Sequence, residues 1–240
     1  MSRNIEGRNP VMESLRSNTK IYKIYIQRSV KDEKRIQEIV ELAKKKDIEL
    51  IETSDLSRLA KTARHQGIIA MAEESEKKKL KDVINDVYSK NLVPFFVVVS
   101  DASYEHNLGT VMRSAEAAGV HAVIISQNSF GITPVVAKSS AGASEHMTLI
   151  QDNLHVALKL IRDSGIKIVA LKEGQKSIFQ CKLDCPLCLI VGSEDKGVNT
   201  TFDKSIDEYA GIPMHGKISS LNMAVAASLA MFEAVRQRNK

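Results

Sequence analysis

From residue 93 onward, apolar blocks and helical repeats alternate regularly along the chain. Blocks typical of buried strands cover residues 95–100, 121–126, 166–171 and 187–191. Segments with apolar residues at helical spacing cover residues 107–118, 152–163 and 219–236. Strands that are apolar on both faces and alternate with helices predict an α/β fold with a mostly parallel, doubly wound sheet. Ligands bind such sheets outside the carboxyl ends of the strands, so we expect functional residues in the loops that follow them.

The first 72 residues have a different pattern. Residues 20–26 have strand composition, residues 32–46 carry apolar positions at helical spacing, and residues 67–72 form a short apolar run. This pattern predicts a compact α/β unit of about 70 residues. Since it contains no obvious catalytic constellation, we expect it to bind a partner.

A charged stretch divides the chain. Residues 73–81 are dense in Lys and Glu and nearly devoid of apolar residues, which is typical of a linker. Val83, Ile84 and Val87 predict a short helix after it. We therefore expect an N-terminal domain at 1–72, a charged linker at 73–92 and a catalytic domain at 93–240.

The net charge of +5 is distributed unevenly. Residues 1–72 hold 15 Lys/Arg against 10 Asp/Glu, whereas residues 73–92 hold 5 against 5 and residues 93–240 hold 14 against 14. The whole excess therefore lies in the N-terminal segment. This asymmetry favours a polyanionic partner for that segment, although an ordinary solvated surface explains the same numbers.

Composition disfavours several classes of protein: disulfide-rich, metal-binding, membrane and secreted. The three cysteines, Cys181, Cys185 and Cys188, are too few and odd in number for a disulfide framework. A zinc site needs about four ligands, and no nearby histidine completes one, so we predict that Cys188 packs in the core and that the protein holds no metal. No run approaches the ~18 apolar residues of a membrane helix, and no secretory signal opens the chain, so we expect a cytoplasmic protein without membrane contact.

Three segments carry polar residues after predicted strands. In the first, residues 107–119, an apolar stripe follows Asn107, which stands where a helix N-cap belongs, and Arg113 lies off the stripe. Asn107 is either a simple cap or a catalytic group. In the second, the run Gly192-Ser-Glu194-Asp-Lys-Gly197 follows a strand and predicts a tight turn that a ligand can approach closely. It matches neither a phosphate-binding loop nor a dinucleotide fingerprint.

The third segment, residues 211–222, leads into the last predicted helix. Ser219 or Ser220 is expected to cap this helix, and Asn222 in its first turn needs a polar partner if it is buried. We predict a core face of mostly small residues made by Leu221, Ala224, Val225, Ser228, Leu229 and Phe232.

Together the three segments resemble the signature motifs of the SpoU family of RNA ribose 2′-O-methyltransferases. Within that family the chain is most similar to the RlmB-type subgroup, which methylates a guanosine in the peptidyl-transferase region of 23S ribosomal RNA. The opening residues 5–11 and residues 65–68 resemble the subgroup's substrate-binding domain, so the resemblance covers essentially the whole chain.

The resemblance implies a SPOUT-type catalytic domain with a C-terminal trefoil knot, S-adenosylmethionine as methyl donor, RNA as substrate and a homodimer with the active site near the subunit interface. By motif position, the residues expected to line the donor site are Gly192, Ile212, Met214 and Leu221. The candidate active-site residues are Asn107, Arg113, Glu194, Ser220 and Asn222. The chain departs from the common pattern at Asp195 and Ala224, where many members have Gly and Ser.

The implied chemistry assigns roles to these residues. Transfer of a methyl group to a ribose hydroxyl requires alignment and removal of the hydroxyl proton. Because arginine has a pKa of about 12.5–13.8, we favour Arg113 as a clamp on an RNA phosphate that stabilises the developing alkoxide, rather than as a general base. Glu194 is expected to orient the ribose, and Ser220 and Asn222 to position backbone and hydroxyl groups.

Other readings stay open. A dehydrogenase or a hydrolase is disfavoured, because the glycine fingerprint and a nucleophile elbow are missing. Within the enzyme class, transfer RNA is the second candidate substrate. A catalytically silent protein that binds ribosomal RNA is the alternative of a different class, and donor binding separates it from an enzyme.

Overall fold

The structure, a computed structural model, describes residues 2–62, 65–74, 77–193, 197–218 and 220–239. The chain forms two compact units, which we call the first unit (residues 1–76 with 132–146) and the second unit (residues 77–131 with 147–240). The second unit begins within the expected linker, and the first unit takes in residues 132–146, which the sequence pattern left in the catalytic part. The boundaries at 72 and 93 stay a prediction.

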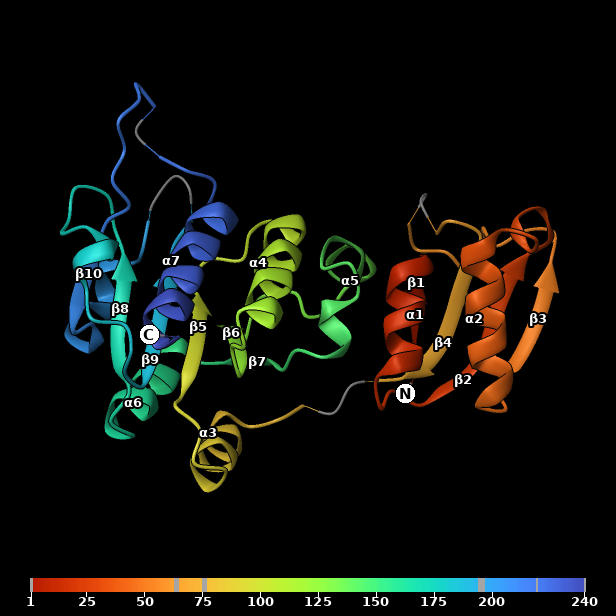
Figure 1. Ribbon diagram of the computed structural model, residues 1–240, viewed down its shortest axis with the longest axis horizontal. Helices are drawn as coiled ribbons and strands as arrows, with labels where there is room; N and C mark the ends of the chain where they lie inside the picture. Colours follow the sequence, from red (N-terminus) through yellow and green to blue (C-terminus); the bar gives the residue numbers. More distant parts are fainter. Residues whose placement is uncertain (1, 63–64, 75–76, 194–196, 219, 240) are drawn as a thin grey trace. The chain divides into compact units, whose positions relative to one another are not determined.

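The second unit contains a six-stranded sheet in which every pairing is parallel (Figure 1). In spatial order the strands are β10 (Glu208–Ala210), β8 (Lys167–Leu171), β9 (Leu187–Val191), β5 (Phe95–Val99), β6 (Ala122–Ser126) and β7 (Leu149–Asp152). All residues of the central strands β5 and β9 are buried. The predicted α/β fold with a mostly parallel sheet is confirmed.

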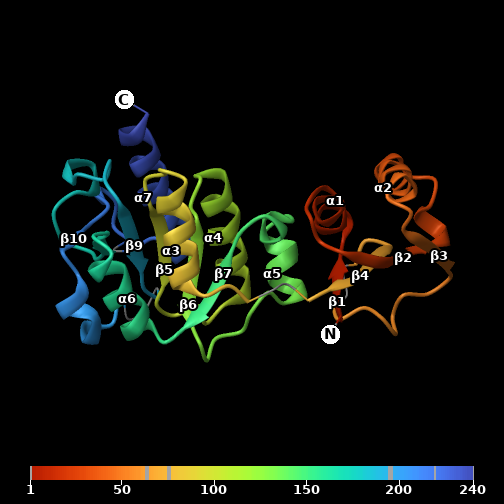
Figure 2. The ribbon, with the colours of Figure 1, turned by 90° about the horizontal axis from the view of Figure 1, so that it is seen from below.

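Helices cover both faces of this sheet. The helices α3 (Leu80–Ser89) and α6 (Leu154–Asp163) pack on the face that carries Phe96 and Ile190. On the other face, α4 (Glu105–Ala117) and α7 (Met223–Arg238) contact each other and the strands β6 and β9. Figure 2 shows α6 and α7 on opposite sides of the strands. This arrangement confirms the doubly wound topology.

The orientation of α7 differs from the sequence-based expectation. Val225, Leu229 and Phe232, which were expected in the core, are 46%, 41% and 47% exposed. The buried apolar face consists of Met223, Ala224, Ala227, Ala230, Met231 and Ala234. The expectation was wrong for Val225, Leu229 and Phe232 and right for Ala224, because small alanines let the helix lie close to β9 and α4 while these three larger side chains point outward.

Both expected helix caps were also wrong. The helix α4 begins at Glu105 after the N-cap Tyr104, so Asn107 lies inside the first turn. Asn222 itself caps α7, because its side-chain oxygen accepts hydrogen bonds from the backbone N–H groups of Ala224 (3.0 Å) and Val225 (3.4 Å). Ser220 therefore precedes the cap, and Ser219 lies outside the described residues.

The first unit is a separate small α/β fold. Its four strands lie in the spatial order β1 (Ser2–Glu6), β4 (Ile68–Glu73), β2 (Ile21–Gln27) and β3 (Glu49–Thr53). The helices α1 (Arg8–Arg16) and α2 (Lys34–Lys45) contribute Leu15, Ile36 and Ile39 to its core. The predicted N-terminal α/β unit is confirmed.

Residues 132–146 belong to this first unit through a buried ion pair. The segment contains α5 (Pro134–Ser139) and a 3-10 turn at Ala143–Glu145. The Arg3 guanidinium donates two hydrogen bonds, of 2.9 and 2.7 Å, to the carboxylate of Glu145, whose side chain is 0% exposed. Gly142 adopts φ +94° against α1, where a Cβ would lie 2.7 Å from Cγ of Glu13. These contacts explain why the segment clusters with β1 and α1.

Further expectations concern the role of Cys188, membrane and metal binding, and the knot. Cys188 is fully buried in β9, which confirms its packing role. Within the described ranges, no helix has the length and hydropathy needed to cross a membrane, and no group of three or more His, Cys, Asp or Glu side chains is placed to hold a metal ion. The chain path through residues 194–196 and 219 lies outside the described part, and the knot stays a prediction.

Candidate active site

A cavity of about 320 Å³ lies in the second unit where β8, β9 and β10 end. Its described lining consists of Leu171, Lys172, Glu173, Val191, Gly192, Ser193, Gly197, Ala210, Ile212, Met214, Ser220, Leu221, Met223 and Ala226. The three strands are parallel neighbours, so their carboxyl ends meet at one edge of the sheet. The cavity is therefore at the place where open α/β sheets bind ligands.

Five of the residues singled out by the sequence meet in this cavity. Gly192 directly follows β9, and Ile212 and Met214 follow β10. Ser220 and Leu221 line the cavity just before α7 begins. Loops from two strand ends and one helix start thus bring together residues that are about 30 positions apart in the chain. Glu194 lies outside the described residues.

Gly192 is required by the close approach of two backbone segments. A Cβ on Gly192 would lie 1.9 Å from the carbonyl carbon of Gly197 and 2.3 Å from the nitrogen of Val198. The backbone N–H of Gly197 donates a 2.9 Å hydrogen bond to the carbonyl of Ser193, which holds these two residues together. Any side chain at position 192 would push this wall of the cavity away, because backbone atoms cannot yield as flexible side chains do.

A second close approach fixes the loop that carries Ile212. A Cβ on Gly211 would lie 3.0 Å from the carbonyl oxygen of Lys172. The N–H of Gly211 donates to the carbonyl of Lys176, and the N–H of Ile178 donates to the carbonyl of Gly211, both at 2.8 Å. The chain after β10 is therefore held against the loop after β8.

The sequence analysis missed part of this lining. Leu171, Lys172 and Glu173 line the cavity at the end of β8. Their signal was the strand pattern itself, because Leu171 ends the apolar block at 166–171 and Lys172 and Glu173 directly follow it. The rule that ligands bind beyond strand carboxyl ends would have found them.

Asn107 and Asn222 contact each other beside the cavity. The Asn222 side-chain amide donates a 3.2 Å hydrogen bond to Oδ1 of Asn107. Further along the same two helices, the hydroxyls of Ser114 and Ser228 are hydrogen-bonded at 2.7 Å. Neither asparagine is part of the described lining, but Asn222 lies directly between Leu221 and Met223, which are. The pair therefore fixes the start of α7 against the first turn of α4.

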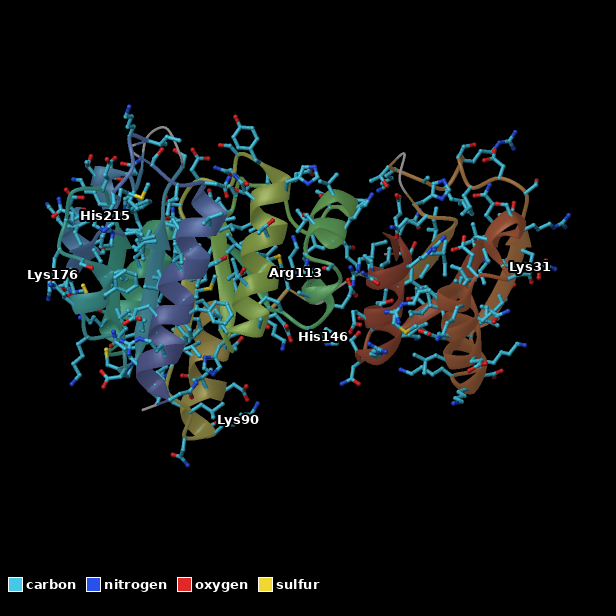
Figure 3. The ribbon with its side chains drawn as sticks, turned by 45° about the horizontal axis from the view of Figure 1, so that its top comes forward. Lys31, Lys90, Arg113, His146, Lys176 and His215 are labelled. Carbon is cyan, nitrogen blue, oxygen red and sulfur yellow. The ribbon has the colours of Figure 1, made fainter. Side chains whose placement is uncertain are left out.

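Arg113 lies outside the cavity. It is exposed on α4 and forms no hydrogen bond or ion pair with a residue that the structure describes. In Figure 3, Arg113 on α4 and His215 on the loop after β10 lie apart. The structure therefore brings together the residues predicted to bind the methyl donor, whereas Arg113 is exposed to solvent.

Ion pairs join β10 to its neighbour β8 and to the loop that follows β8. The carboxylate of Glu208 accepts hydrogen bonds from Nζ of Lys167 (2.8 Å) and of Lys176 (3.0 Å). These contacts, with Lys167 contributing most, lower the pKa of Glu208 to about 2. Burial and a hydrogen bond to Asp203 raise the pKa of Tyr209 to about 12. The strand that leads to Ile212 is thus anchored by ion pairs that do not enter the cavity.

The cavity suits a ligand with a flat apolar part and several polar groups. Leu171, Val191, Ile212, Met214 and Leu221 provide apolar walls. Gly192, Ser193, Gly197 and Ser220 add polar backbone and hydroxyl groups to the lining. The described lining contains neither histidine nor cysteine. Apart from Lys172 and Glu173, the described lining offers a bound molecule apolar contacts and hydrogen-bonding groups.

Comparisons with known families match nearly the whole chain. Residues 94–232 match the model of the SpoU rRNA Methylase family. Residues 4–78 match the model of the RNA 2′-O ribose methyltransferase substrate binding domain. The cavity and the Asn107–Asn222 pair lie in the first of these matches, and the small α/β fold lies in the second.

Individual proteins agree with these matches. A putative TrmH family tRNA/rRNA methyltransferase, YacO of Bacillus subtilis, is 36% identical over 97% of this chain and 95% of its own length. The 23S rRNA (guanosine-2′-O-)-methyltransferase RlmB of Photorhabdus laumondii is 37% identical over 80% of each chain. A crystal structure of an RNA 2′-O ribose methyltransferase superposes with a TM-score of 0.80, covering 100% of this chain and 90% of that one; at 23% identity this likeness supports the fold.

Proposed function

The chain belongs to the SpoU family of S-adenosylmethionine-dependent RNA methyltransferases, and from this premise we propose that its substrate is a guanosine ribose in the peptidyl-transferase region of 23S ribosomal RNA. One observation carries the proposal. A single chain joins a match to the substrate-binding model at 4–78 to a methylase match at 94–232, and a relative named 23S rRNA (guanosine-2′-O-)-methyltransferase RlmB is 37% identical. The reaction belongs to the cytoplasm, where ribosomal RNA is made.

Transfer RNA is the second candidate. The printed name of the Bacillus subtilis relative includes both RNA classes, so the relatives support two substrates. The positive excess of the first 72 residues favours a large folded RNA contacted through two domains. We therefore rank ribosomal RNA above transfer RNA as the substrate.

The cavity fits the methyl donor. Its volume of about 320 Å³ is at the lower end of the roughly 300–1,000 Å³ range of small-molecule sites. The Gly192 turn brings bare backbone to the cavity wall, which suits recognition of a nucleoside through N–H and C=O groups. We assign donor binding to Gly192, Ile212, Met214 and Leu221. S-adenosylmethionine supplies a methyl group already activated on a sulfonium.

The protein's own residues then have to align the ribose and help its hydroxyl lose a proton. Ser220, at the cavity wall, is placed to position the hydroxyl group. The Asn107–Asn222 hydrogen bond fixes the backbone that carries Ser220. Arg113 clamps an RNA phosphate, which takes the hydroxyl proton, and stabilises the developing alkoxide, since arginine keeps its charge at neutral pH. Glu194 orients the ribose.

A homodimer accounts for two features of the second unit. Val225, Leu229 and Phe232 follow the spacing i, i+4 and i+7, so they form an exposed apolar stripe on α7. Arg113 lies on the neighbouring helix α4 and outside its own cavity. We therefore propose that two copies pair through the stripe of α7 and that this pairing brings Arg113 to RNA bound by the partner.

The test is methyl transfer from labelled S-adenosylmethionine to unmodified 23S ribosomal RNA and, separately, to unmodified transfer RNA. The modified position is mapped by the resistance of its ribose linkage to alkaline cleavage. Label at one guanosine ribose of the 23S molecule is the expected result. Label confined to transfer RNA would overturn the substrate, and failure to bind the donor would leave only a silent RNA-binding protein.

A further inference from the structure

Three connections of the first unit meet at one edge of its sheet. Strands β1, β2 and β3 run in one direction and β4 runs against them. The ends of β1, β2 and β3 therefore lie at the same edge as the beginning of β4. The described segments at this edge are residues 7–8, 28–33, 54–62 and 65–67. Four cations are exposed in these described segments, and we call them the basic edge: Arg28, Lys31 (labelled in Figure 3), Arg58 and Lys61.

A buried carboxylate shapes the loop that carries two of these cations. Glu6 is 1% exposed at the end of β1. Its carboxylate accepts hydrogen bonds from the N–H of Lys61 (2.5 Å) and from both the N–H (3.0 Å) and the hydroxyl (2.6 Å) of Thr62. A buried charge is unfavourable unless its oxygens are fully hydrogen-bonded. Here the hydrogen bonds hold the backbone of Lys61 in one conformation.

Further contacts hold the backbone on both sides of Arg58. Leu56 is 1% exposed and anchors the loop in the core. The side-chain amide of Asn4 donates a 2.9 Å hydrogen bond to the carbonyl of Leu59. The N–H and O–H of Ser57 bind the carboxylate of Asp55, and these bonds, with a smaller contribution from Arg58, lower the pKa of Asp55. These contacts therefore hold the described part of the loop in place, although that part contains no helix or strand.

A strained turn connects this loop to the segment that carries Arg28 and Lys31. Gln66 adopts φ +54°, and a Cβ on Gly67 (φ +78°) would lie 2.4 Å from a methyl group of Val30. The backbone N–H and Nε of Arg8 donate hydrogen bonds to the side chain and the backbone carbonyl of Gln66. Strained positive-φ residues persist only where the surroundings hold them. The backbone that carries Arg28 and Lys31 is thus held against the backbone of the loop that carries Arg58 and Lys61.

The two arginines of the basic edge also differ from the other described arginines of the unit in how they are paired. Arg3, Arg8, Arg16 and Arg35 form ion pairs with glutamates of the same unit. Among the described residues, Arg28, Lys31, Arg58 and Lys61 form none. The two described arginines of this unit that lack an ion pair therefore lie at the same edge, and their charge is available to an outside anion.

We propose that the basic edge binds the phosphate backbone of folded RNA and that Glu6 is a positioning residue that holds Lys61 and its loop for this contact. The inference rests on the proposed function only in taking RNA as the substrate. Arginine forks and lysine ammonium groups are the side chains that bind phosphate oxygens most strongly. Phosphate contacts position a protein on RNA without reading its sequence.

The decisive variant replaces Arg28, Arg58 and Lys61 together by glutamine, since all three side chains are exposed. The control variant replaces Lys44, Lys45 and Lys46 by glutamine. This change removes the same charge from exposed positions at the end of α2. The probe is a fluorescently labelled fragment of 23S ribosomal RNA that lacks ribose methylation. Protein is titrated into this probe at several salt concentrations. We expect the edge variant to bind at least tenfold more weakly, with the salt slope reduced by about 0.7–0.9 per lost phosphate contact. Equal losses in both variants, or wild-type binding by the edge variant, would overturn the proposal.

Glu6→Gln tests the positioning role separately. We expect a higher KM for RNA, unchanged kcat and KM for the donor, and a smaller salt slope. A purely structural role predicts a lower melting temperature with the salt slope unchanged, and that result would contradict the assignment of Glu6. If Glu6→Gln fails to fold, Lys61→Gln provides the same salt-slope readout from an exposed position.

RNA binding and methyl transfer are read independently in these experiments. Loss of RNA binding by the edge variant supports the proposal even if wild-type protein labels no 23S ribosomal RNA, in which case only the proposed substrate fails. Normal labelling by an edge variant that binds RNA like wild type would overturn the basic edge and leave the proposed function intact.

Discussion

The cavity of the second unit and the basic edge of the first unit each lie at the carboxyl ends of strands that run in the same direction. The two sites nevertheless consist of chemically different residues. The cavity is a partly open hollow lined mainly by apolar side chains and glycine backbone. The basic edge is open and carries exposed arginine and lysine side chains. A small ligand needs enclosure, because specificity comes from close contact over most of its surface. A polyanion needs accessible charge, because its binding is driven by counterion release.

The support beneath each site differs in the same way. In the cavity, glycines at 192 and 211 let backbone segments approach each other closely. At the basic edge, the buried carboxylate of Glu6 holds a loop through hydrogen bonds. A change in the cavity should therefore affect donor binding through shape, and a change at the basic edge should affect RNA binding through charge.

The largest expected effect is that of Gly192→Ala on donor binding. The added Cβ would lie 1.9 Å from the backbone of Gly197, so the cavity wall has to move. We expect the donor affinity, measured by calorimetry, to fall about 100-fold, as severe overpacking of about 3 kcal/mol implies. Gly216→Ala is the matched control, because a Cβ there meets nothing within 4 Å. Equal donor binding by both variants would refute the close-approach argument, and RNA affinity should stay unchanged in each.

Arg113→Lys should reduce catalysis while leaving both binding sites intact. Lysine keeps the charge but loses the bidentate geometry of the guanidinium. We expect single-turnover methyl transfer to slow by about 10- to 100-fold, in line with the loss of a hydrogen bond to a charged group. Donor affinity should stay at the wild-type value, because Arg113 does not line the cavity. A rate close to that of wild type would exclude the clamp.

Leu229→Glu should weaken pairing of two copies. The change places a charge in the exposed apolar stripe of α7, where Leu229 is 41% exposed. We expect the dimer dissociation constant, measured by sedimentation, to rise by about tenfold or more, as for a central interface residue. Val156→Glu is the control, because Val156 is 59% exposed on α6, which lies on the other face of the sheet. A similar loss in both variants would argue against an interface at α7.

The sequence predicted the strands of the second unit with unequal success. The apolar blocks at β5, β6, β8 and β9 were located to within one or two residues, because strands buried on both faces contain little but apolar side chains. The edge strands β7 and β10 were missed, since each is short and contains polar or charged residues such as Gln151 and Glu208. Strand β1, with only Ile5 as a large apolar residue, was missed for the same reason.

The candidate site was predictable at the level of loops but not of orientation. Motif position identified Gly192, Ile212 and Met214, which the structure brings into one cavity. The face that α7 buries could not be read from hydropathy, because a stripe of alanines competed with a stripe of larger residues and close packing favoured the alanines. The contact between Asn107 and Asn222 joins residues 115 positions apart, which local patterns do not reveal.

The smallest expected effect concerns the ion pairs that anchor β10. The pKa of Glu208 is lowered from 4.5 to about 2, chiefly by Lys167, so its contribution to stability is present above about pH 4.5 and is lost as the pH falls toward 2. Glu208→Gln removes this dependence. Because the side chain is 23% exposed, we expect a difference of about 1 kcal/mol between pH 5 and pH 2.5 in the free energy of unfolding. Identical acid unfolding of variant and wild type would show that the ion pairs contribute nothing.

The separation of donor and RNA sites is tested most directly by steady-state methyl transfer with both substrates varied. Met214→Ala represents the cavity, and the triple glutamine variant of Arg28, Arg58 and Lys61 represents the basic edge. The account predicts that the cavity variant raises the KM for S-adenosylmethionine alone and that the edge variant raises the KM for RNA alone. If either variant raises both constants by the same factor, the two sites are not independent and the account is contradicted.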